Sequence, residues 1–324
     1  MNKQSWLISF NFVSMLCAML FSHFAVSQQF KSAYELLAEM TNSADKLNYS
    51  GLVTYEKSGR LKSLKVLHLA RDGISYEKIV HVDGPKGEFA QLRHRSACKT
   101  GNAMISEKDL PSLNEDSLKR FAGSYSFEIR GKSRVASRIG TLLFIKPNDQ
   151  FRLPYILTID QQTNLILKSV ILDLSGKPLE RFQFVEIAIG GNLDLLELPT
   201  PAAPDNRNGN CNRGFIEKEQ RQWVVNWMPP GFVMTASEKN EASDHTTMVF
   251  SDGLASFSVF VISDTKGSGL PSFTSSSGAT TVVSVKLNLD GAPITVSVVG
   301  EIPQSTARKI AQSILRSSEI TETT

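Results

Sequence analysis

The feature that most constrains the fold is a succession of strand-length segments. Apolar residues, many of them β-branched or aromatic, recur along these segments, and Gly, Asp, Asn or Pro closes most of them. Short loops join one segment to the next, and such loops connect antiparallel neighbours. The sequence therefore predicts a large antiparallel sheet. Its expected strands are 49–57, 61–71, 74–82, 89–95, 124–129, 134–147, 152–160, 166–174 and 179–189.

Few segments have helical periodicity. The sequence predicts helices over 33–46, 114–121 and 304–317, and apolar residues in the last recur at i, i+3, i+4, i+7 and i+8. A large sheet with so few helices to cover it is expected to curve strongly or to form an incomplete barrel. The predicted fold class is therefore mainly β with a few helices (α+β).

A second group of predicted strands begins near Arg221 and is organised by strong turn signals. Strands are expected over 222–227, 232–237 and 248–261, with Asp252-Gly253 bending the last into a hairpin. A Gly/Ser-rich loop over 265–279, strands over 280–289 and 293–300, and the last helix complete this group. Three of its aromatic residues are candidate partner contacts, because such side chains supply large binding surfaces: Trp223, Trp227 and Phe257.

The chain of 324 residues is long enough for two domains. A Pro-rich and polar stretch breaks the strand pattern and is typical of a linker. The predicted organisation is a signal peptide at 1–27, a half-barrel domain at 28–190, a linker at 191–220 and a small domain at 221–324.

The N-terminus predicts the compartment. Lys3 precedes an apolar run over 6–24, and Ala25-Val26-Ser27 supplies the small residues that a signal peptidase accepts. We expect export to the periplasm with cleavage near Ser27. An uncleaved membrane anchor is the alternative, because the run is about long enough to span a bilayer.

Two cysteines, Cys98 and Cys211, remain after the predicted cleavage. An oxidising compartment allows them to form a disulfide. Their separation does not decide whether they are paired or free.

Composition and motifs exclude several classes of function. The formal net charge is +3 and the pI about 8.6, which disfavours a nucleic-acid partner. The sequence lacks the zincin, nucleophile-elbow, Cys-x-x-Cys and phosphate-loop motifs, so no metal, cofactor or catalytic residue is predicted. Fragments resembling a penicilloyl serine transferase occur at Ser43, Lys99 and Ser112, but in the wrong order for that family. The sequence predicts a binding protein, not an enzyme.

Several segments resemble one family. WMPPGF followed by SDGLASFSVFV, together with DGPKGEFAQLR, GKSRVASRIG and GEIPQSTARKIAQSI, resembles the RseB/MucB family across nearly the whole mature chain. The resemblance implies a large domain similar to the lipoprotein carriers LolA and LolB, with a lipid-sized apolar cavity. It also implies a periplasmic negative regulator of the sigma-E envelope-stress response.

Such a regulator is expected to bind the periplasmic part of an RseA/MucA-like anti-sigma factor and to protect it from DegS-type proteolysis. A lipid signal such as lipopolysaccharide would release it, and homo-oligomerisation stays open. Arginines at a cavity rim are candidate phosphate contacts, although charged residues in that position are more often simply solvated: Arg93, Arg95, Arg134 and Arg138. The alternative function is a LolA-type carrier of lipid or lipoprotein.

Overall fold

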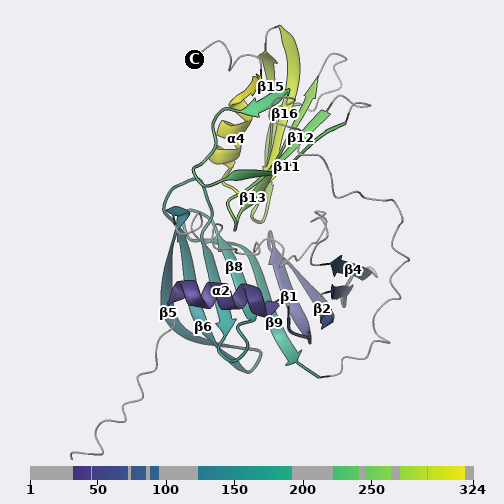
Figure 1. The fold of residues 1–324 in the computed structure, drawn as a ribbon, viewed down its shortest axis with the longest axis vertical. Coiled ribbons are helices and arrows are strands. Elements are labelled where there is room, and N and C mark those ends of the chain that lie inside the picture. The colour runs from purple at the N-terminus through teal and green to yellow at the C-terminus, as the bar shows by residue number, and fades with distance from the viewer. Residues whose placement is uncertain are drawn as a thin grey trace, which may run out of the picture. The chain divides into compact units, whose positions relative to one another are not determined.

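The computed structural model describes residues 32–44, 46–71, 74–84, 88–94, 123–191, 222–240, 245–263, 271–289 and 291–317 (Figure 1). All of these except Ser32 belong to one unit, Ala33–Thr324. The elements of the first half are α2 (Ala33–Ala44), β1 (Tyr49–Lys57), β2 (Arg60–Arg71), β3 (Ile74–His81), β4 (Glu88–His94), β5 (Tyr125–Val135), β6 (Arg138–Pro147), β7 (Tyr155–Asp160), β8 (Ile166–Leu172) and β9 (Pro178–Ile189). Those of the second half are β10 (Trp223–Val225), β11 (Val233–Asn240), β12 (His245–Ser251), β13 (Ser256–Ser263), β14 (Phe273–Ser277), β15 (Thr280–Leu289), β16 (Ala292–Gly300), α4 (Gln304–Gln312) and β17 (Ile314–Arg316).

The first half forms one antiparallel sheet of nine strands in the order β4-β3-β2-β1-β9-β8-β7-β6-β5. Consecutive strands pair from β1 to β4 and from β5 to β9, and β9 lies beside β1 to join the two groups. Within the described strands β4 and β5 end the sheet without pairing with each other, so the sheet is open. Figure 1 shows α2 lying across one face of it. The predicted fold class, a mainly β protein built on a curved antiparallel sheet, is confirmed.

The core beneath α2 explains how this short helix is held. Leu36, Leu37 and Met40 are 5%, 0% and 1% exposed. They pack on buried side chains of β5, β6 and β7, which follow the two-residue period of a sheet face: Tyr125, Leu143, Ile145, Tyr155, Leu157 and Ile159. Leu254, from the second half of the chain, is buried in the same cluster.

A second cluster continues on β1, β2, β3 and β9, and it includes Val53, Val66 and Phe184. Tyr55 and Phe182 are packed against it and are only half-buried. The large sheet therefore carries apolar side chains beyond the strands that α2 packs on.

The second half forms a six-stranded antiparallel sheet in the order β11-β12-β13-β16-β15-β14, with β10 and β17 as a separate pair. Helix α4 buries Ala307, Ile310 and Ala311 in the core of this small sheet. The predicted combination of a smaller sheet with one helix is confirmed.

Three local predictions were wrong. The break expected between strands 124–129 and 134–147 is a bulge inside β5, and the chain reverses at Ala136 and Ser137, which both have positive φ angles. The last helix ends at Gln312, because Ile314–Arg316 leaves it to pair with β10. The Gly/Ser-rich segment contains strand β14, which has little buried surface and is held by its pairing with β15.

A fourth difference concerns the start of β7. The sequence predicted a strand from Arg152, whereas β7 begins at Tyr155 and Arg152 lies in the preceding loop. The helix predicted over 114–121 and the signal peptide lie outside the described residues. No helix in the described part of the chain combines the length and hydropathy needed to cross a membrane.

Candidate functional site

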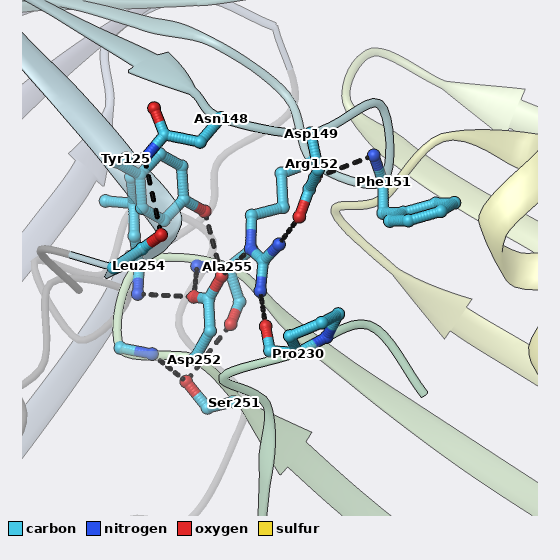
Figure 2. A network of polar contacts seen from close by, with 12 residues as sticks. Tyr125, Asn148, Asp149, Phe151, Arg152, Pro230, Ser251, Asp252, Leu254 and Ala255 are labelled. Carbon is cyan, nitrogen blue, oxygen red and sulfur yellow. Dashed lines mark hydrogen bonds and ion pairs between the residues drawn. The ribbon is translucent and has the colours of Figure 1, made fainter. Parts of the chain in front are cut away.

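A buried polar network links the large sheet to the small sheet (Figure 2). Its centre is Asp252, which follows β12 in the turn that leads to β13. One carboxylate oxygen, Oδ1, accepts hydrogen bonds from the backbone N–H groups of Leu254 and Ala255, each at 2.9 Å. This is the turn chemistry expected of an Asp before Gly. The turn leaves the other oxygen, Oδ2, for partners on the large sheet.

Arg152 and Tyr125 of the large sheet both donate to Asp252 Oδ2. The Nε of Arg152 lies 2.6 Å from it and the hydroxyl of Tyr125 lies 2.9 Å from it. The side chains of Arg152 and Asp252 are both 0% exposed. A buried carboxylate that accepts four hydrogen bonds is a well-satisfied charge, which is what burial of an ion requires.

The other two nitrogens of the Arg152 guanidinium are also engaged. Its guanidinium donates to the carboxylate of Asp149 and to the backbone carbonyl of Pro230, which precedes β11. The guanidinium carbon lies 4.9 Å from the centroid of the Phe232 ring. Arg152 therefore contacts two separate loops of the small sheet, the Asp252 turn and the Pro230 turn.

Two members of this network, Tyr125 and Arg152, keep their protons near neutral pH. Burial, and next the negative charge of Asp252, raises the pKa of Tyr125 well above its ordinary value of 10.0. Burial acts to lower the pKa of Arg152, but the hydrogen bond and charge of Asp252 outweigh it and raise that pKa. Neither group is suited to proton transfer at physiological pH, so the network serves to hold two sheets together.

An aromatic contact lies close to this network. The rings of Phe151 and Trp227 meet edge to face with centroids 5.2 Å apart. The ammonium of Lys309, on α4, lies 3.8 Å from the centroid of the Trp227 ring. Such a cation placed over an indole ring adds attraction beyond simple burial.

A second polar contact between the sheets is centred on Glu180 of β9. Its carboxylate accepts hydrogen bonds from the Tyr55 hydroxyl at 2.6 Å and from the backbone N–H of Ala279 at 2.9 Å. Lys57 forms an ion pair with it at 3.0 Å and donates to the hydroxyl of Thr280 at 3.1 Å. The turn between β14 and β15 is thus fixed to the large sheet by one carboxylate and one ammonium group.

The structure places two of the predicted arginines on one hairpin. Arg134 of β5 is exposed. Arg138 of β6 makes a two-point ion pair with Asp160, with Nε–Oδ1 and Nη2–Oδ2 distances of 3.0 Å and 2.8 Å. It also donates to Gln162. The guanidinium of Arg138 is therefore engaged within the sheet, and a phosphate contact by either arginine stays a prediction.

The predicted aromatic contacts divide into two kinds. Trp223 and Phe257 are 2% and 1% exposed and belong to the core of the small sheet. Trp227 is half-buried in the aromatic contact with Phe151. In this structure their described contacts are internal, and a role against a partner stays a prediction for all three.

The other predicted residues cannot be placed. Arg93 lies in strand β4, and its side chain is outside the described part. Arg95, Cys98 and Cys211 lie outside the described residues, so the pairing of the cysteines stays untested. Among the residues that the structure does describe, no group of His, Cys, Asp and Glu is arranged to hold a metal ion.

Sequence reasoning missed Tyr125, Arg152 and Glu180. The only local signal was a single arginine between apolar residues in Phe151-Arg152-Leu153-Pro154. A charged residue in such a setting needs a buried counterion, but the sequence does not say which one.

Comparison with known proteins identifies the family. The profile of the MucB/RseB N-terminal domain matches residues 32–202, and that of the MucB/RseB C-terminal domain matches residues 217–315. The chain is 31% identical to the sigma factor AlgU regulatory protein MucB of Pseudomonas aeruginosa, over 84% of this chain and 87% of that protein. It is 28% identical to the sigma-E factor regulatory protein RseB of Haemophilus influenzae, over 95% of this chain and 98% of that protein.

The fold leads to the same family. A solved structure of MucB in complex with MucA(peri) matches with a TM-score of 0.67 and 28% identity, covering 88% of this chain and 99% of that chain. The two sheets of the fold and the two domain profiles support the same assignment. The chain belongs to the MucB/RseB family.

Proposed function

We propose that this protein is a periplasmic negative regulator of a sigma-E-type stress response. It binds the periplasmic part of an RseA/MucA-like anti-sigma factor and protects that factor from DegS-type proteolysis. The observation that carries the proposal is the match to MucB in complex with MucA(peri), which extends over nearly the whole of that chain. The names of the relatives, both sigma factor regulatory proteins, support it.

The N-terminal sequence supports the compartment. A positive residue, an apolar run and the small residues up to Ser27 form the pattern of an exported protein. Cleavage near Ser27 leaves residues 28–324 as the mature chain, with a large domain at 28–190, a linker at 191–220 and a small domain at 221–324.

The chemistry of the described residues supports binding without catalysis. The strongly shifted tyrosine and the buried arginine of the network keep their protons at neutral pH. A general acid or base is most effective when its pKa lies near the working pH. The network has the properties of a structural link, not of a catalytic site.

A lipid signal, such as lipopolysaccharide, releases the regulator from its partner in this proposal. Half-buried apolar side chains on the large sheet, Tyr55 and Phe182 among them, support acyl-chain binding there. Arg134, exposed on the β5–β6 hairpin, is the candidate phosphate contact. Two ligands whose binding is mutually unfavourable suffice for such a release.

The test uses the purified mature chain and the periplasmic segment of an RseA/MucA-like anti-sigma factor from the same organism. Saturating protein is expected to bind the segment and to slow its cleavage by a DegS-type protease. Unchanged cleavage at saturation rejects the proposal. Adding lipopolysaccharide is expected to restore cleavage.

A pair of variants examines the phosphate contact. Arg134→Glu is expected to raise the lipopolysaccharide concentration needed for release by at least roughly fivefold, because loss of one cation near an anionic lipid surface alone has about that effect and the reversal adds a negative charge. Lys146→Glu reverses another exposed cation, on strand β6, and serves as the matched control. An equal effect of both reversals removes Arg134 from the site.

A further inference from the structure

Among the described residues, two sets of polar contacts that differ in character join the large and small sheets. We call the first the anchor contact; it comprises Tyr125, Arg152, Asp252 and Leu254. We call the second the Glu180 contact; it comprises Tyr55, Lys57, Ser58 and Glu180 with the 277–280 turn between β14 and β15.

The anchor contact is dry and partly apolar. The side chains of Arg152 and Asp252 are 0% exposed, and Leu254 of the small sheet is 3% exposed among the residues that α2 covers. Opening this contact exposes Leu254 to water and separates Arg152 from the Asp252 and Pro230 turns. Water can form new hydrogen bonds with the polar groups, but it does not offset the free energy of exposing the leucine.

The Glu180 contact is polar and partly open to water. Lys57 keeps 31% of its side chain exposed, although Glu180 is 8% exposed. Ser58 meets the 277–280 turn through exposed contacts, with its Oγ 3.4 Å from Ser277 Oγ and 2.7 Å from the N–H of Gly278. Water can replace each of these partners when the contact opens, so its net contribution is small.

We propose that the Glu180 contact is a gate, which opens while the anchor contact stays closed, so that the small sheet pivots about Arg152 and Asp252. Local opening with unequal free energies is the general behaviour of folded proteins, and the contact with least apolar burial opens first. Opening of the gate is proposed for this chain by itself and does not require a bound partner. Only its use in releasing a partner rests on the proposed function.

Glycine at position 278 is what allows the gate to close. Gly278 has a φ of +56°, and a Cβ there would lie 2.3 Å from Glu180 Oε1 and 2.5 Å from Glu180 Cγ. Any side chain at this position therefore displaces the Glu180 carboxylate from the turn. Asn tolerates this backbone conformation better than other non-glycine residues, so Gly278→Asn acts as a wedge with little strain in the turn itself.

The chain also supplies a matched control. Gly291, in the turn between β15 and β16, has a φ of +77°, and no atom outside its chain neighbours lies within 4 Å of a Cβ built there. Gly291→Asn makes the same change in another hairpin turn of the same sheet without touching the large sheet.

The experiment measures the reaction of buried thiols with a maleimide. Ala279→Cys reports on the gate, because Ala279 is 2% exposed and its N–H bonds to Glu180. Ser124→Cys reports on the anchor contact, because Ser124 is 7% exposed and its hydroxyl would lie 2.6 Å from a Cβ at Gly231 of the small sheet. Each is made in the mature chain with Cys98→Ser and Cys211→Ser, and each rate is normalised to that of the unfolded chain.

The thiol at position 279 is expected to react at least about tenfold faster than the thiol at position 124. Gly278→Asn raises the rate at 279 further and leaves the rate at 124 unchanged, whereas Gly291→Asn changes neither. Equal rates at both positions, or a wedge that accelerates both alike, show that the small sheet undocks as a whole and overturn the proposal.

A reversible lock connects the gate to partner release. Ser58→Cys with Ser277→Cys places two thiols where the hydroxyls are 3.4 Å apart, close enough for a disulfide. In the oxidised chain, lipopolysaccharide-triggered release of the anti-sigma segment is expected to slow at least about tenfold, and a reductant restores it. Normal release from the oxidised chain overturns this use of the gate, whereas failure to bind the segment at all counts against the proposed function instead.

Discussion

Arg152 Nε lies 2.6 Å from Asp252 Oδ2, between residues that are 100 positions apart in the sequence, and neither side chain is exposed. Arg152 follows β6 in the large sheet, and Asp252 follows β12 in the small sheet. This buried ion pair therefore fixes the position of one sheet relative to the other.

Removing the carboxylate of Asp252 is expected to lower the free energy of unfolding substantially. Asp252→Ala leaves Arg152, Tyr125 and two backbone N–H groups without their acceptor, and breaking a buried ion pair from one side costs about 3–5 kcal/mol. Urea unfolding measures the loss. The control is Asp173→Ala, since Asp173 accepts backbone hydrogen bonds from Ser175 and Lys177 in an exposed turn. A loss no larger than that of the control contradicts the buried link.

Because the pKa of Tyr125 is raised in the folded chain, we expect the free energy of unfolding to decline in alkaline solution. Its pKa in the folded chain lies well above 10.0, chiefly because of burial, whereas the unfolded chain ionises this phenol near 10. The stability that the neutral phenol provides is therefore complete below pH 10 and is lost as the pH rises above it. Urea unfolding between pH 8 and about 11 is expected to show a shallower decline for Tyr125→Phe. Parallel curves for both chains exclude Tyr125 as the cause.

The variant Tyr125→Phe also has an effect at neutral pH. It removes the hydroxyl that donates to Asp252 at 2.9 Å, and a hydrogen bond to a charged acceptor contributes about 1.5–3 kcal/mol. The neutral-pH loss and the alkaline slope are separate quantities from the same unfolding series.

Leu254 is expected to stabilise the docking by apolar burial. Leu254→Ala removes a side chain that is 3% exposed in the cluster beneath α2, a change that costs about 2–5 kcal/mol in a well-packed core. Leu174→Ala is the control, because Leu174 is 53% exposed, and its cost is expected to stay within about 0.5 kcal/mol. Thermal unfolding compares the two. Similar melting temperatures for both variants contradict an anchoring role of Leu254.

Because the pKa of Asp160 is lowered in the folded chain, we expect the free energy of unfolding to decline in acid. Burial acts to raise its pKa, but hydrogen bonds from Arg138 and Thr163 outweigh burial and place the pKa below 3.8. The folded chain thus holds this carboxylate ionised where the unfolded chain protonates it. The contribution is complete above pH 3.8 and is lost as the pH falls through the lower, folded value.

The variant that tests this is Arg138→Ala. It leaves a side chain of 1% exposure without its ion pair, so a loss of roughly 2–3 kcal/mol at pH 7 is expected, less than for a fully buried pair because Arg138 itself is 24% exposed. Its stability curve is expected to fall less steeply below pH 4 than that of the parent chain. An unchanged acid slope shows that other carboxylates control the acid transition.

Local sequence patterns were sufficient to predict the class of the fold and most of its strands. Alternation of side chains and the turn residues define β1 and β15 to the residue, because both are local properties of a strand and its ends. The apolar stripe of α4 likewise identified Ala307, Ile310 and Ala311 as core residues. Combined motifs also indicated the family, which the comparisons confirm.

Pairing between strands that are distant in the sequence overrides the local preference of two segments. Ile314 and Leu315 continue a helical pattern, yet they form β17 because β10 offers backbone partners. The segment Phe273–Ser277 has one large apolar residue and becomes a strand because β15 lies beside it. In both cases a backbone hydrogen-bond partner distant in sequence outweighs a weak intrinsic preference.

The candidate site depends on tertiary structure throughout. Asp252 was predicted as a turn residue, and one of its oxygens does hold the turn, but the other binds a large-sheet arginine that no sequence spacing connects to it. Sequence patterns record which face of an element avoids water, since that property repeats every few residues. Which buried charge meets which depends on how two finished sheets dock, because only docking removes the water that would otherwise satisfy each ion separately.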